Sequence, residues 1–254
     1  VVSVRVEGGE LVKEAKIGRA DMDADVFISL THFKGHELTG FGGCFKNIGM
    51  GCASRAGKME QHNSGKPSVD QSACVGCRAC SANCAHEAIS FAEKKASIDH
   101  EKCVGCGRCL GACNFDAIYN ENPSAVKDLN LKMAEYTKAV VAGRPAFHIS
   151  LVIDVSPYCD CHPENDVPIL PDIGMFASFD PVALDQACAD ACNAQQPMRG
   201  SILDEHIHEE GFCDHHDHFT NTTPESEWET CLAHAEEIGL GSRAYELVEV
   251  KRGK

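Results

Sequence analysis

The stretch Cys74-Val-Gly-Cys-Arg-Ala-Cys-Ser-Ala-Asn-Cys84 recurs along the chain as Cys103-Val-Gly-Cys-Gly-Arg-Cys-Leu-Gly-Ala-Cys113. Both copies have the form C-x2-C-x2-C-x3-C, and each cysteine of the first copy has a counterpart 29 residues later. Ala88-Ile89 also repeats at this offset, as Ala117-Ile118. Two copies of one short motif predict a small unit with pseudo-two-fold symmetry.

The repeated cysteines have the spacing of iron–sulfur ligands. In proteins with two such runs, the fourth cysteine of each run binds the cluster of the other run, so we expect two crossed [4Fe–4S] clusters. The expected ligands of the first are Cys74, Cys77, Cys80 and Cys113. Those of the second are Cys103, Cys106, Cys109 and Cys84. A zinc ribbon or a disulfide knot is the alternative, and the complete double motif disfavours it.

The overall composition restricts the classes of protein. The chain has 16 cysteines in 254 residues, which indicates metal binding in a reducing, cytoplasmic and anaerobic setting rather than a secreted disulfide scaffold. It contains no apolar run long enough to cross a membrane. A formal net charge of −15 disfavours nucleic acid and suits a basic redox protein partner. We therefore expect an iron–sulfur electron-transfer protein.

Strand and helix patterns alternate on both sides of the repeat. Apolar runs predict strands over 25–31, 147–153 and 245–250. Helical spacing predicts helices over 124–142, 181–193 and 226–238. The pattern indicates an α/β domain interrupted by a small α+β bacterial ferredoxin-like insert. The expected parts are 1–69 and 123–254 for the α/β domain and 70–122 for the insert.

A glycine-rich stretch from Gly35 to Gly57 precedes the insert. Its glycines indicate turns and close approach of the backbone to another group. Five polar side chains accompany these glycines: Lys34, Lys46, Asn47, Arg55 and Lys58. Together with the backbone N–H groups, they would form a cradle for an anionic substrate or cofactor. The spacing is neither that of a P-loop nor G-x-G-x-x-G, so a nucleotide is not specifically indicated. A surface of solvated basic side chains is the alternative.

Eight cysteines lie outside the double motif. The run from Cys159 through Asp160 and Cys161 to His162 holds four possible ligands in four residues, so Cys159 and Cys161 are candidates for a third metal site. Their alternative role is that of small buried hydrophobic residues, the reading we favour for Cys188, Cys192 and Cys231. The histidine-rich residues 204–218 suit a solvated loop better than a dedicated metal site.

Several stretches resemble the signature of the domain of unknown function 362 family. They are Thr31 to Lys58, Cys159 to Cys161 with Pro171 to Gly174, Ser178 to Asp185, and Ala235 to Val248. Members of that family commonly carry a two-cluster ferredoxin insert at this place, so the resemblance implies the same insert here. It also implies a further segment of the α/β domain ahead of Val1, which is missing from this sequence or supplied by a second chain.

The resemblance also implies a set of candidate site residues. They are His32, Lys34, His36, Lys46, Asn47, Asp160, Asp180 and Asp185. Asp180 also precedes Pro181 at a predicted helix start, where it suits a purely structural N-cap. The family implies no settled reaction. Three functions stay open: an oxidoreductase or oxidoreductase subunit with its site in the α/β domain, a ferredoxin-like relay without its own catalysis, and a protein that handles metal or clusters.

Overall fold

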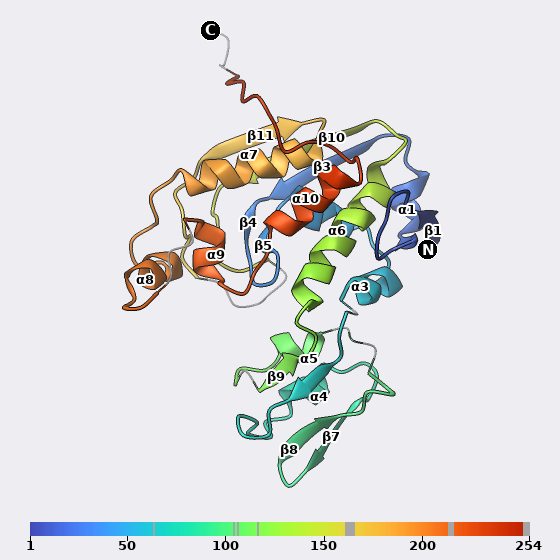
Figure 1. Ribbon diagram of the computed structural model, residues 1–254, viewed down its shortest axis with the longest axis vertical. Coiled ribbons are helices and arrows are strands. Elements are labelled where there is room, and N and C mark those ends of the chain that lie inside the picture. The colour runs from blue at the N-terminus through green and yellow to red at the C-terminus, as the bar shows by residue number, and fades with distance from the viewer. Residues whose placement is uncertain are drawn as a thin grey trace. The chain divides into compact units, whose positions relative to one another are not determined.

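The computed structural model describes residues 1–62, 64–103, 105, 107–115, 117–160, 166–212 and 216–250 (Figure 1). The chain divides into two compact units. The α/β unit consists of Val1–Ala53 and Asn130–Lys254, and the cysteine-rich unit consists of Ser54–Leu129. The stretch 70–122, predicted as an insert, falls within the cysteine-rich unit.

A three-stranded mixed sheet in the order β11–β10–β3 forms the frame of the α/β unit. β3 (Phe27–His32) runs parallel to β10 (Ala146–Val152), and β11 (Gly174–Ser178) runs antiparallel to β10. The predicted strands 25–31 and 147–153 are confirmed as β3 and β10. The predicted strand 245–250 is wrong, because those residues form no strand. A strand needs a partner edge, which an apolar pattern alone does not supply.

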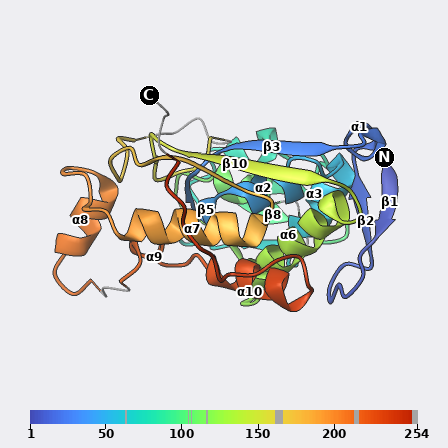
Figure 2. The same ribbon diagram turned by 90° about the horizontal axis from the view of Figure 1, so that it is seen from above.

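Helices cover one face of this sheet. α2 (Cys44–Gly49) packs against β3, and α7 (Pro181–Asn193) packs against β10 and β11. Figure 2 shows α7 and α10 (Glu229–Glu237) together on one side of the sheet. Asp180 caps α7, since its Oδ1 accepts hydrogen bonds from the amides of Val182 at 2.8 Å and Ala183 at 3.1 Å. The N-cap prediction is thus confirmed.

The remaining elements of the α/β unit are short apart from α6 (Ala125–Val141), whose first residues belong to the cysteine-rich unit. Two hairpins are formed by β1 (Val2–Arg5) with β2 (Glu14–Ile17), and by β4 (Lys34–His36) with β5 (Gly40–Gly42). The short helices are α1 (Arg19–Asp23), α8 (Ile202–His208) and α9 (His218–Thr222). No helix in the described part of the chain has both the length and the apolar character needed to span a membrane.

The cysteine-rich unit repeats its structure as well as its sequence. β6 (Pro67–Val69) pairs with β9 (Ile118–Asn120), and β7 (Ile89–Ala92) pairs with β8 (Lys95–Ile98), both antiparallel. The helices α4 (Ala79–Ala82) and α5 (Arg108–Gly111) begin at equivalent positions of the two copies, and α3 (Arg55–His62) precedes them. The repeat in the sequence therefore corresponds to a repeat of folded elements.

The sheet buries a polar face against the helices. Ser29 on β3 and His148 on β10 are both buried there, and the Ser29 hydroxyl lies 2.9 Å from His148 Nδ1. Within the described residues, His148 Nε2 has no hydrogen-bond partner. Burial lowers the pKa of His148 from 6.5 to about 4, although the Asp180 carboxylate opposes the shift. The ring is therefore neutral in the folded protein at neutral pH.

We expect the free energy of unfolding of the α/β unit to fall as the pH drops from about 6.5 to about 4. The unfolded chain binds a proton at His148 before the folded chain does, so acid favours unfolding. The drop in the pKa of His148 from 6.5 to about 4 corresponds to a loss of about 3 kcal/mol in the free energy of unfolding. Urea unfolding at a series of pH values measures it. Over the same pH range, the free energy of unfolding of a His148→Gln chain should fall by about 3 kcal/mol less than that of the parent chain. An equal fall in the two chains would contradict the prediction.

Candidate functional site

Four cysteines of the cysteine-rich unit line one cavity of about 310 Å³. They are Cys74, Cys77, Cys80 and Cys113. Three of them come from the first copy of the repeat and one comes from the second. Apolar side chains such as Phe91 and Ile118 complete the lining, and the Arg78 guanidinium lies 5.0 Å from the centre of the Phe91 ring. The fold thus brings together the four cysteines that the motif assigns to one cluster.

A second cavity, of about 340 Å³, has the reciprocal composition. Cys103 and Cys109 of the second copy line it together with Cys84 of the first copy. Ile89 and Ile98 contribute apolar surface. Cys106, the fourth predicted ligand of this group, lies outside the described residues. In both cavities, the fourth cysteine of one copy therefore joins cysteines of the other copy.

Backbone amides point at several of these sulfur atoms. Cys74 Sγ lies 3.4 Å from the amide of Ala96, and Cys103 Sγ lies 3.4 Å from the amide of Gly105. Gly76 and Gly105 occupy equivalent positions with φ of 71° and 72°. At Gly76 a Cβ would lie 2.0 Å from the carbonyl oxygen of Lys94, so only glycine fits this turn. Amide donors of this kind stabilise negative charge on thiolate sulfur.

The chemistry of these donors distinguishes between kinds of metal centre. Among the described residues, no three His, Cys, Asp or Glu side chains converge where a single metal ion would bind. A [4Fe–4S] cluster needs a different arrangement, because each of its four cysteine thiolates binds a separate iron atom. The four sulfur atoms therefore surround the cluster and do not converge on a single point. Groups of thiols set among apolar side chains are the kind of donor that a [4Fe–4S] cluster uses.

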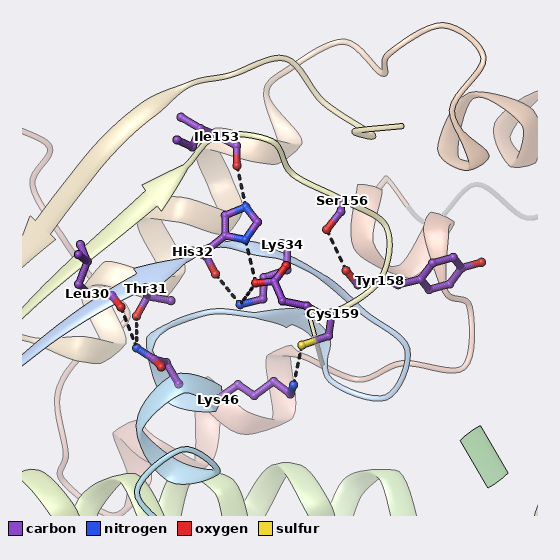
Figure 3. A network of polar contacts seen from close by, with 11 residues as sticks. Leu30, Thr31, His32, Lys34, Lys46, Ile153, Ser156, Tyr158 and Cys159 are labelled. Carbon is purple, nitrogen blue, oxygen red and sulfur yellow. Dashed lines mark hydrogen bonds and ion pairs between the residues drawn. The ribbon is translucent and has the colours of Figure 1, made fainter. Parts of the chain in front are cut away.

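A second polar group lies in the α/β unit where the parallel strands β3 and β10 end (Figure 3). His32, the last residue of β3, has Nδ1 at 2.9 Å from Asp160 Oδ2 and Nε2 at 2.9 Å from the carbonyl oxygen of Ile153. Lys34 Nζ lies 3.3 Å from the same Asp160 oxygen and donates to the His32 carbonyl at 2.7 Å. Although partial burial opposes it, hydrogen bonding to His32 and the charge of Lys34 lower the pKa of Asp160.

Lys46 and Asn47 extend this group from α2. Lys46 Nζ donates to Cys159 Sγ at 2.8 Å (Figure 3). Asn47 Nδ2 donates to the Leu30 carbonyl at 3.1 Å and to the Thr31 hydroxyl at 2.9 Å. The predicted candidates His32, Lys34, Lys46, Asn47, Asp160 and Cys159 thus gather at one end of the sheet. This is where ligand sites of α/β sheets lie.

Glycines make room for the group. A Cβ at Gly42 would lie 3.1 Å from Lys34 Cε and 3.4 Å from Lys46 Cδ, so the missing side chain leaves space for both lysine stems. At Gly35, a Cβ would lie 2.2 Å from the Pro157 carbonyl oxygen. The loop that carries Cys159 and Asp160 therefore approaches the β4 backbone directly. These close approaches explain Gly35 and Gly42 within the glycine-rich stretch.

Two other candidates make their contacts with backbone amides. Asp185 is fully buried, and its carboxylate oxygens accept from the amides of Cys44 at 2.7 Å and Phe45 at 3.0 Å. Burial raises the pKa of Asp185 to about 7, and the two amides oppose that shift. His36 Nδ1 accepts from the amides of Leu38 at 3.0 Å and Thr39 at 3.2 Å. The structure thus gives both side chains a role in holding the backbone.

The remaining sequence candidates do not join this group in the described residues. Cys161 and His162 lie outside the described residues. Cys188, Cys192 and Cys231 are buried in the hydrophobic core, as expected for small apolar residues. Burial raises the pKa of all three thiols. From the histidine-rich stretch, His206 and His218 each lie within 3 Å of a backbone carbonyl oxygen.

Backbone oxygens that no sequence motif indicates complete the site. The carbonyl oxygens of Ile153 and Leu30 contact His32 and Asn47. Ile153 directly follows β10, so the rule that sites lie at the carboxyl ends of parallel strands could have indicated it. No pattern in the sequence singles out Leu30, because its carbonyl is one of many along β3.

The fold and the two groups of side chains define a mixed α/β protein that carries a repeated, cysteine-lined unit. Residues 1–190 match the family model described as domain of unknown function (DUF362). Since the match covers well over half of the chain, the protein belongs to this family. The resemblance is confirmed for the stretches within residues 1–190, whereas the stretch from Ala235 to Val248 lies beyond the match. No curated protein matched the sequence. The family description names no reaction, so any function must be argued from the sites themselves.

Proposed function

We propose that this protein transfers electrons through two [4Fe–4S] clusters held by the cysteine-rich unit. The observation that carries the proposal is the exchange of cysteines between the two copies. Cys113 shares a cavity with the first three cysteines of the first copy, and Cys84 shares a cavity with Cys103 and Cys109. This is the ligand pattern of two-cluster ferredoxins, and we infer a ferredoxin-like unit from it.

The chain itself would bind the clusters and keep water from them. The cysteine thiolates supply the ligands, while Phe91 and Ile118 in one cavity and Ile89 and Ile98 in the other provide apolar walls. Amide groups such as that of Ala96 at 3.4 Å from Cys74 Sγ donate to the ligating sulfur. A bound [4Fe–4S] cluster supplies one-electron redox chemistry whose potential depends on such hydrogen bonds and on burial.

We further propose that the protein is an oxidoreductase rather than a plain relay. The group of His32, Lys34, Lys46, Asp160 and Cys159 supports this reading. A relay has no need for two lysines, a histidine and a thiol gathered at the carboxyl end of a sheet. The formal charge of −15 suits a basic redox protein as the electron donor or acceptor.

The first test is the metal content of protein purified without oxygen. We expect about eight Fe and about eight sulfide per chain, with coupled signals in the EPR spectrum of the reduced protein. A Cys231→Ala chain serves as the control, because Cys231 is a buried core residue of the α/β unit and should not affect the iron content. Stoichiometric zinc without iron, or disulfide-bonded protein without metal, would overturn the proposal.

A further inference from the structure

The three-stranded sheet of the α/β unit has helices on one face, and its opposite face, here called the outer face, is apolar and exposed. In Figure 2, α7 and α10 lie together on the helix side of the sheet. Because successive side chains of a strand alternate between the two faces, every second residue points to the outer face. These residues include Ile28 and Leu30 of β3, Met175 of β11, and Phe179 directly after β11. The four residues leave between 63 and 80 % of their surface in water.

The middle strand makes the outer face continuous. Phe147 of β10 pairs with Ile28 of β3, and the centre of its ring lies 4.8 Å from the centre of the Phe179 ring. Ile149 of β10 pairs with Leu30 in the same way. Among the described residues of the three strands, no Lys, Arg, Asp or Glu lies on this side. The outer face is therefore a single apolar surface without ionic side chains.

A face of this kind indicates a binding partner. β3 and β10 are parallel, and parallel strands are almost always covered on both faces. Contiguous apolar patches of more than a few hundred Å² are rare on soluble monomers unless they bind something. With side chains of this size, the outer face presents on the order of 700 Å². Each partner in a standard protein interface buries about 800 Å², so two such faces suffice for a stable complex.

Two properties favour a second copy of this chain as the partner. Without ionic side chains, the outer face has no means of selecting a basic or an acidic protein by charge. The face is also self-complementary, because an in-plane two-fold axis that places one outer face on another brings apolar side chains onto apolar side chains. His32, the polar residue of this face, lies at its corner beside Leu151, where an interface has its polar rim.

We propose that two copies of the chain associate through the outer faces of their sheets, packed face to face as a β-sandwich. His32 also belongs to the group of side chains at the end of the sheet, so the second copy borders the candidate site of the α/β unit. The inference concerns this unit alone and does not depend on the iron content of the cysteine-rich unit.

The experiment is sedimentation equilibrium of the full chain, purified without oxygen. We expect a monomer–dimer equilibrium with a dissociation constant of about 1 µM or lower. Leu30→Glu should raise this constant at least about a hundredfold, because it places an unpaired carboxylate inside the interface. Met175→Glu is the second variant, on the other edge strand, and should act in the same way. Both residues are well exposed in the single chain, so neither substitution should disturb its fold, which circular dichroism verifies.

The matched control is Leu247→Glu. Leu247 is 65 % exposed and Leu30 is 63 % exposed, but Leu247 lies in the C-terminal segment outside the sheet, so its substitution should leave the association unchanged. Ammonium sulfate should strengthen the association, because it favours apolar burial and screens the repulsion between two chains of formal net charge −15. Association held by ionic contacts would weaken instead.

Three results would overturn the proposal. The first is a chain that stays monomeric up to about 100 µM, which would leave the outer face to a different protein or segment. The second is a dimer that withstands both Leu30→Glu and Met175→Glu, which would place the interface elsewhere. The third is a dimer that dissociates when the salt concentration is raised.

Discussion

A Cys77→Ser chain is expected to bind about four Fe in place of about eight. Cys77 is one of four cysteines that line the first cavity, and a serine oxygen is a poorer ligand for iron than a thiolate. The cysteine-rich unit should also lose stability, because in small metal-binding units the free energy of metal binding supports the fold. Iron and sulfide analysis of protein purified without oxygen measures the effect.

Double variants test which cysteines share a cluster. Cys113 lines the same cavity as Cys77, so Cys77→Ser with Cys113→Ser should lose little more iron than Cys77→Ser alone. Cys84 lines the other cavity, so Cys77→Ser with Cys84→Ser should lose nearly all of the iron. The reverse result would mean that each copy binds its own cluster. A Cys77→Ser chain with unchanged iron would refute the ligand assignment.

A Glu135→Leu chain is expected to lose about 3–5 kcal/mol of stability. Glu135 lies on α6 with no exposed surface, and its carboxylate accepts hydrogen bonds from the backbone amides of Glu10, Leu11 and Val12. His234 Nε2 lies 3.1 Å from the same carboxylate. Leucine has no acceptor, so the substitution removes the partner of the buried Val12 amide and of the His234 ring, and the part-buried amides of Glu10 and Leu11 lose the same acceptor. Urea unfolding followed by Trp228 fluorescence reports on the α/β unit, because Trp228 is the single tryptophan.

Glu237 provides the matched control for this substitution. Its carboxylate contacts the other nitrogen of His234 at 3.6 Å, but its side chain is 77 % exposed. We expect Glu237→Gln to change the free energy of unfolding by less than about 1 kcal/mol, since exposed ion pairs contribute little. Equal losses in the free energy of unfolding for Glu135→Leu and Glu237→Gln would contradict the prediction, because they would show that burial of the carboxylate does not determine its contribution to stability.

Much of the architecture follows from patterns close together in the sequence. The 29-residue repeat predicts a symmetric unit, and the structure has equivalent strands and helices in the two copies. Apolar runs predict β3 and β10, and Asp180 before Pro181 predicts the start of α7. These features could be predicted because helix caps, strand periods and short motifs act over a few residues.

The candidate site was predicted as a set of residues but not as an arrangement. The resemblance to the family places His32 and Asp185 in one group, yet His32 contacts Asp160 while Asp185 binds the amides at the start of α2. The predicted strand at 245–250 does not form, because an apolar pattern in the sequence does not supply a neighbouring strand with which these residues could pair. Each of these outcomes depends on which segments pack together.

The sequence by itself determined the repeated cysteine motif, the alternation of strands and helices, and the family to which the chain belongs. Only the tertiary structure decided that Lys46 faces Cys159 and that Glu135 holds the turn near Val12. The physical reason is the range of the interactions. Local preferences act along the chain, whereas contacts between residues more than a hundred positions apart arise only when a core brings their elements together.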